Sequence, residues 1–163
     1  MGQKQKYLMI HCTATQEGKD YTGQDVIRWH TSPVPKGGRG WKQVGYSELI
    51  WRNGLSENLV PHNDDEIIDV REITNGASGY NGIARHICYV GGVDKNGKAK
   101  DTRTEEQKKT LEQHVRTAIY HNPDLLVIGH NQVASKACPS FNVARWLEEI
   151  GIPSKHIIHG NIK

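Results

Sequence analysis

Short apolar runs and longer segments with helical periodicity alternate along the chain. Strands are expected where apolar residues cluster over about four to eight positions, in residues 7–11, 44–51, 56–60, 83–90 and 125–128. Helices are expected from Thr22 through Trp29, from Thr104 to about residue 122, and over residues 142–150. The first two open on capping-box patterns, Thr22 with Asp25 and Thr104 with Gln107.

The segments between these elements look like turns and loops of one domain. Residues 31–40 hold two prolines and three glycines, and residues 52–54 resemble a hairpin turn. The chain has no repeat, low-complexity tract or linker. We therefore expect residues 1–163 to form a single domain of the α/β class, with helices packed on a central sheet.

Composition narrows the possible partners. Hydrophobic residues make up 36% and charged residues 24%, as in ordinary soluble enzymes. The net charge of +3 favours approach to an anionic surface, but no run of Lys and Arg indicates a nucleic-acid partner. The odd count of 3 cysteines excludes a full disulfide framework and favours a reducing compartment.

The N-terminus gives an expectation about location. Its basic residues are followed by only Leu8, Met9 and Ile10 as an apolar stretch, too short for a signal peptide or a membrane span. We expect synthesis in the cytoplasm, no membrane insertion and a monomer.

Two histidines occupy equivalent places in the pattern. His11 closes the first strand and His130 closes the strand of residues 125–128, and the carboxyl ends of strands in open α/β sheets build ligand crevices. Cys138 follows His130 across a loop that can fold back toward it. Two imidazoles and one thiolate suit zinc with a fourth position free for water, which indicates hydrolysis.

An ordered set of short motifs between Tyr7 and Leu147 resembles the motifs of a known family, the zinc-dependent N-acetylmuramoyl-L-alanine amidases. That family includes amidase-type phage lysozymes and peptidoglycan recognition proteins. The motifs are His11-Cys12-Thr13-Ala14-Thr15, Trp29-His30, Gly45-Tyr46, Gly79-Tyr80-Asn81, Val90-Gly91-Gly92-Val93-Asp94, Gly129-His130 and Lys136-Ala137-Cys138-Pro139-Ser140-Phe141.

The resemblance implies a function and a site. Its zinc ligands fall on His11, His130 and Cys138, and its catalytic residues on Tyr46 and Lys136. Lys136 and Tyr46 would stabilise negative charge on the attacked carbonyl, or Tyr46 would orient water or carry its proton. The implied reaction is hydrolysis of the amide between N-acetylmuramic acid and L-alanine in bacterial peptidoglycan. The implied fold is a central mixed sheet with helices on both faces.

One position departs from the family pattern. Phage members often carry a histidine three residues before the glycine of the Gly-Tyr-Asn motif, where this chain has Gly76. The missing imidazole puts a contact on the substrate side in doubt, but not the metal site.

The remaining polar residues have simpler interpretations. Cys12 should point away from His11 because neighbouring side chains alternate along a strand, and Cys88 is expected to be a buried apolar residue. His30 is expected to pack or to line the cleft. Residues 63–66 are expected to be a solvated acidic loop, with a calcium-like cluster as the alternative. The other histidines are expected at the surface: His62, His86, His114, His121, His156 and His159.

Three other functions compete with the amidase. The chain could be a peptidoglycan-binding module without catalysis, although such relatives commonly lack the thiol that Cys138 supplies. It could be a cysteine hydrolase with Cys138 as nucleophile and His130 as base, which leaves His11 unexplained. It could be a zinc peptidase that cuts within the stem peptide. Because no signal peptide is expected, we predict a phage or prophage lysis protein, or an effector delivered by separate machinery.

Overall fold

Parallel strands form the centre of the sheet, and one antiparallel strand closes an edge. The structure is a computed structural model that describes residues 2–162. The strand order is β5-β4-β7-β2-β9; β4, β7, β2 and β9 are mutually parallel, and β5 is antiparallel to β4. The sheet is therefore mixed, as predicted. The strands are β2 (Tyr7–Cys12), β4 (Glu48–Ile50), β5 (Ser56–Asn58), β7 (Ala84–Tyr89) and β9 (Leu126–Gly129).

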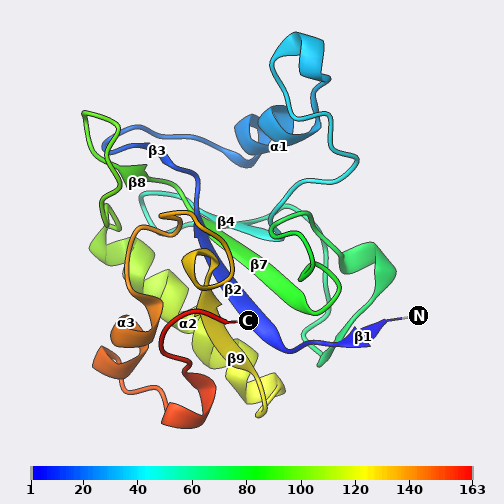
Figure 1. The fold of residues 1–163 in the computed structure, drawn as a ribbon, viewed down its shortest axis with the longest axis vertical. Coiled ribbons are helices and arrows are strands. Elements are labelled where there is room, and N and C mark those ends of the chain that lie inside the picture. Colours follow the sequence, from blue (N-terminus) through cyan, green and yellow to red (C-terminus); the bar gives the residue numbers. More distant parts are fainter. Residues whose placement is uncertain (1, 163) are drawn as a thin grey trace.

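Helices cover both faces of this sheet (Figure 1). On one face, Leu111 of α2 (Glu105–His121) and Leu147 of α3 (Val143–Glu149) join the core cluster of Ile10. On the other face, Val26 of α1 (Gly23–Thr31) joins a separate cluster. Residues of β7 alternate between the two clusters, as expected for a strand buried on both sides. No described helix is both long and apolar enough to cross a membrane.

Several short elements were not predicted. Two-residue strands pair as β1 with β6 and as β3 with β8. Segments this short show no alternation that a sequence pattern could reveal. They are β1 (Gln3–Lys4), β3 (Thr15–Gln16), β6 (Ile67–Ile68) and β8 (Gly92–Val93), with 3-10 turns at Val34–Lys36, Val70–Glu72, His130–Gln132 and Ser154–His156.

The strand predicted over residues 44–51 is shorter than expected, because only Glu48–Ile50 forms β4. The preceding backbone finds other partners. The amide of Gly45 donates to the side chain of His30 at 3.0 Å, and the carbonyl of Val44 accepts from the amide of Asn75 at 3.0 Å. This irregular approach places Tyr46 beside the sheet rather than within it.

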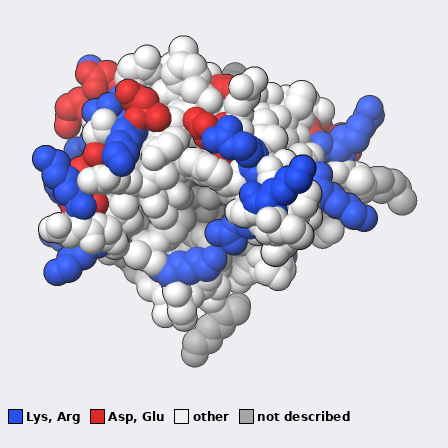
Figure 2. All heavy atoms as spheres, turned by 90° about the horizontal axis from the view of Figure 1, so that it is seen from above, with Lys and Arg blue, Asp and Glu red and all other residues white. Residues whose placement is uncertain are grey.

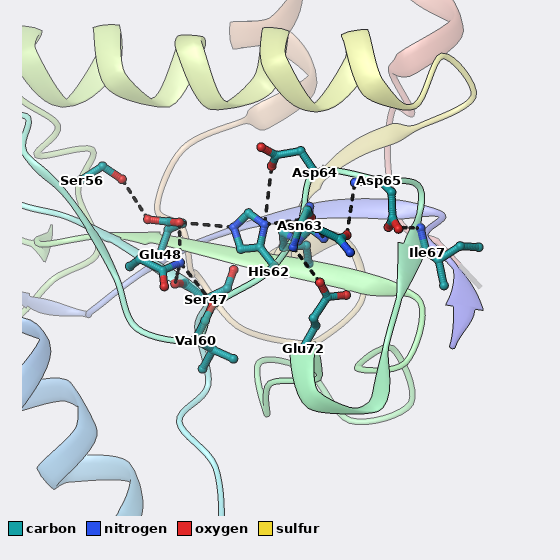
Figure 3. A network of polar contacts seen from close by, with 12 residues as sticks. Ser47, Glu48, Ser56, Val60, His62, Asn63, Asp64, Asp65, Ile67 and Glu72 are labelled. Atoms are coloured by element: carbon teal, nitrogen blue, oxygen red, sulfur yellow. Dashed lines mark hydrogen bonds and ion pairs between the residues drawn. The ribbon is translucent and has the colours of Figure 1, made fainter. Parts of the chain in front are cut away.

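A polar network on Glu48 joins the β4–β5 hairpin to the loop that follows it (Figure 3). The Glu48 carboxylate accepts from Ser56 at 3.1 Å and Asn58 at 2.8 Å, and lies 3.3 Å from His62 Nε2. His62 in turn lies 3.5 Å from a carboxylate oxygen of Asp64. The acidic loop is thus held by polar contacts to the hairpin.

We expect Glu48→Ala to lower the free energy of unfolding by about 1–3 kcal/mol, because three polar partners lose a charged acceptor. Urea denaturation measures the change. Glu112→Ala is the matched control, since Glu112 makes an exposed pair with Arg116 on α2 and should contribute at most about 0.5 kcal/mol. Equal losses for both variants would contradict a structural role for the network.

Candidate active site

His11 lies at the carboxyl end of the central strand β2, and its ring is buried. It is only 1% exposed. Its ring centroid lies 4.6 Å from that of His130 and 5.1 Å from that of Tyr46. Because β2 and β9 are adjacent and parallel, the residues that follow them meet at the same edge of the sheet. The structure therefore brings the two histidines together, as the sequence predicted.

Cys138 reaches this edge on the loop between β9 and α3. The buried hydroxyl of Tyr89 donates to the carbonyl of Pro139 at 2.7 Å, and the backbone amide of Cys12 donates to Cys138 Sγ at 3.3 Å. These contacts bring Cys138 Sγ to 3.7 Å from His11 Nδ1. The loop therefore folds back, as the spacing from His130 allows.

One group among residues 2–162 has ligand atoms close enough to hold a metal ion, and it consists of His11, His130 and Cys138. One ligand atom from each lies within 4.8 Å of the others. Around a tetrahedral zinc ion, ligand atoms lie roughly 3.3–3.7 Å apart, given bond lengths of about 2.0–2.3 Å. Small side-chain shifts would suffice, so the donor set and its spacing fit zinc.

The protonation of the two imidazoles also fits metal binding. Burial lowers the pKa of His11 well below its usual value, with further contributions from neighbouring histidines and Lys136. Burial and the charge of Lys136 lower the pKa of His130 to about 4. Both rings are therefore neutral at neutral pH and can offer a nitrogen lone pair. The hydrogen bond with Cys12 and burial raise the pKa of the Cys138 thiol, so its proton must leave when a cation binds.

Tyr46 lies next to the candidate metal group and is positioned by His30. The His30 ring lies 5.2 Å from the Tyr46 ring and 4.8 Å from Trp41. Its Nδ1 accepts from the amide of Gly45, where an added Cβ would come within 3.0 Å of the ring. Glycine at position 45 thus permits the close approach. Burial raises the pKa of Tyr46 well above its usual value, which keeps the phenol protonated.

Lys136 is exposed on the loop that carries Cys138. Residues 131–137, with Asn161 and Ile162, line a cavity of about 530 Å³ beside it. Figure 2 views the end of the molecule at which β2 terminates and shows a hollow with lysine and arginine side chains near its rim. Lys136 lies close enough to His130 for its charge to contribute to lowering the pKa of that imidazole.

Two predictions about histidines are wrong. His86 and His156, expected at the surface, are 0% and 1% exposed. His86 contacts the candidate site directly, with its Nδ1 2.8 Å from His11 Nε2. The signal that could have revealed it is its position in the middle of the apolar run of residues 83–90.

Other side chains lie where the sequence predicted. Cys12 joins the core cluster on the opposite face of β2 from His11, and Cys88 is buried. His121 and His159 are exposed, as predicted. His62 and His114 are exceptions, because they were expected at the surface and are half-buried. The acidic loop of residues 63–66 contributes to no metal-binding group among the residues described.

The fold is shared with a peptidoglycan recognition protein and a phage endolysin. The structure superposes on Drosophila PGRP-LB with a TM-score of 0.68 at 19% identity, covering 99% of this chain and 88% of that one. It superposes equally well, at 20% identity, on the endolysin of a Thermus scotoductus bacteriophage, with a TM-score of 0.68 and coverage of 97% and 88%.

The sequence then defines the family. Residues 1–141 match the N-acetylmuramoyl-L-alanine amidase family, and the chain belongs to it. The endolysin of Escherichia phage T7 is 31% identical over 142 residues, which cover 87% of this chain and 85% of that endolysin. The predicted enzyme class is confirmed: the chain is a peptidoglycan amidase.

Proposed function

We propose that this amidase is zinc-dependent and that His11, His130 and Cys138 hold the metal. The observation that carries the proposal is the approach of their ligand atoms to within 4.8 Å at one edge of the sheet. Bound zinc would supply a Lewis acid that polarises the substrate carbonyl and lowers the pKa of water. The substrate bond is the amide between N-acetylmuramic acid and L-alanine.

The protein's own residues stabilise the charge that develops on the carbonyl oxygen. Tyr46 is a neutral phenol beside His11 and donates a hydrogen bond to that oxygen. Its raised pKa favours this role over action as a phenolate base. Lys136 places a positive charge on the same side of the site, as its effect on the pKa of His130 indicates. Tyr46 is held in place by its packing against His11 and His30, so its hydroxyl needs little reorganisation during the reaction.

We further propose that the enzyme acts as a monomer in phage-type lysis, reaching the wall after lysis begins or through separate machinery. The similarity to phage endolysins supports this role. The net charge of +3 and the lysine and arginine side chains near the hollow favour approach to an anionic cell wall.

Digestion of purified peptidoglycan tests the proposed bond specificity. We expect the products to be peptides with a free N-terminal alanine and glycan strands whose muramic acid lactyl groups end in carboxylates. Mass spectrometry identifies both products, and Cys138→Ala serves as the inactive control. New reducing sugar ends would indicate a glycosidase, and peptides that begin after a later stem residue would indicate a peptidase.

Two alternatives give different results in this assay and in a binding assay. A binding module would carry zinc near one equivalent and bind the wall without releasing peptides. The side chains of Tyr46 and Lys136 beside the metal group argue against it. A cysteine hydrolase would retain activity after chelation. It gives no role to His11, although the Nδ1 atom of that buried ring faces Cys138 Sγ at 3.7 Å.

A further inference from the structure

A chain of hydrogen bonds extends from His11 into the protein, away from the candidate metal position. His11 Nε2 lies 2.8 Å from His86 Nδ1, and His86 Nε2 lies 3.0 Å from Asn81 Oδ1. His86 stands on β7 and is fully buried. The reaction assigns no role to His86 or Asn81, so this buried chain needs another explanation.

Asn81, the last residue of this hydrogen-bonded chain, determines which nitrogen atoms carry protons. Asn81 Oδ1 also accepts from the backbone amide of Ala77 at 2.9 Å, so the atom facing His86 is the oxygen. His86 Nε2 must therefore carry a proton. No carboxylate pairs with His86 among residues 2–162, and a buried unpaired charge is costly, so the ring is neutral. Its Nδ1 then has only a lone pair.

The lone pair on His86 Nδ1 fixes the tautomer of His11. His11 Nε2 must donate the proton in their shared hydrogen bond, which leaves His11 Nδ1 without one. His11 Nδ1 is the atom that faces Cys138 Sγ. The buried chain thus aims the unprotonated nitrogen at the metal position.

Gly76 provides the space for this arrangement. A Cβ added at position 76 would come within 2.3 Å of both Cγ and Nδ1 of His86. Position 76 is also where phage members of the family often carry a histidine. This chain therefore places an imidazole from β7 in space that any side chain at position 76 would enter.

We infer that His86, backed by Asn81, is a positioning residue that fixes the tautomer and orientation of His11, and that Gly76 is required to admit its ring. The inference rests on the proposed zinc site. A histidine that ligates zinc commonly donates its other N–H to an acceptor, and loss of that acceptor weakens metal affinity by about 10- to 100-fold. In this chain the acceptor is a neutral imidazole.

Zinc affinity, measured by competition with a chromophoric chelator, tests the inference without reference to turnover. We expect His86→Leu to bind zinc about 10- to 100-fold more weakly than wild type. His86→Asn keeps an acceptor near the position of Nδ1 and should recover much of the loss. Gly76→Ala retains His86 but displaces its ring, so it should also weaken binding. In cobalt-substituted protein, His86→Leu and Gly76→Ala should alter the visible absorption of the metal.

His156→Leu is the matched control for loss of a buried imidazole. His156 is 1% exposed and donates from Nδ1 to the carbonyl of Leu125, at the opposite end of β9 from His130. It should lose stability yet keep wild-type zinc affinity. If His86→Leu does not fold, His86→Asn and Gly76→Ala decide the question.

The outcomes separate this inference from the proposed function. Wild-type zinc affinity in folded His86→Leu or Gly76→Ala would overturn the positioning role. The same conclusion would follow if His86→Asn bound zinc as weakly as His86→Leu. If wild type bound no stoichiometric zinc, or if Cys138→Ala bound it equally well, the proposed zinc site itself would fail.

Discussion

Cys138→Ala is expected to reduce bound zinc from near one equivalent to a small fraction and to slow hydrolysis by at least about 10³-fold. Removal of the sulfur leaves two imidazoles, His11 and His130, which are too few ligands to hold the ion in a fixed geometry. Metal analysis after dialysis and peptide release from peptidoglycan measure the two effects. Chelation of wild type should produce the same loss, and added zinc should reverse it.

Cys88→Ala is the matched control for this variant. Cys88 is a buried thiol on β7 that belongs to a core cluster and not to the metal group. Its loss should cost stability but leave zinc content unchanged. Thiol alkylation distinguishes the cysteine-nucleophile alternative, because a metal-bound sulfur is shielded. Rapid inactivation of the zinc-loaded enzyme by an alkylating reagent, with resistance to chelation, would contradict the proposal.

The elements predicted best are those whose signals are local. The helix α2 begins where the capping box predicted, with the amide of Gln107 donating to Thr104 Oγ at 3.1 Å and the amide of Thr104 donating to Gln107 Oε1 at 2.9 Å. Strands β2 and β7 match their apolar runs because both faces are buried. Residues 44–47 did not follow their pattern, since their backbone partners, His30 and Asn75, come from distant segments.

The site could be predicted only in part from the residues themselves. The strand-end positions of His11 and His130 are a local signal, and parallel strands bring such positions together. The approach of Cys138 depends on contacts with Tyr89 and Cys12, which lie far away in the sequence. The ordered motifs of the family supplied that information, and the same is true of Tyr46.

The relation between Gly76 and His86 could not be predicted from the sequence. The sequence showed that a family histidine was absent at position 76, but not that a ring from a neighbouring strand enters the same space. Such proximity depends on the path of the loop of residues 73–83 over β7. A pattern along the chain contains no information on distances of this kind.

Tyr46→Phe is expected to lower kcat by about 10²-fold while KM and zinc content change little. The variant removes one hydrogen-bond donor that acts on the charge formed during the reaction. Lys136 remains and continues to stabilise that charge, so activity should fall without disappearing. Because a phenylalanine ring preserves the packing on His11 and His30, the metal group should be undisturbed. Steady-state kinetics on a soluble muramyl peptide measure kcat and KM separately.

Tyr21→Phe provides the control for loss of a tyrosine hydroxyl. Tyr21 packs on Trp29 at 5.1 Å between ring centroids and belongs to the same core cluster as Tyr46. It lines a cavity with Trp51 and Arg52 that includes neither Tyr46 nor the metal group. Its variant should keep wild-type kinetics. An unchanged kcat in Tyr46→Phe would remove the phenol from the reaction, and a rise in KM alone would make it a substrate-binding group. A fall in kcat with constant KM is the result that charge stabilisation requires, because the interaction is made only as the carbonyl oxygen becomes negative.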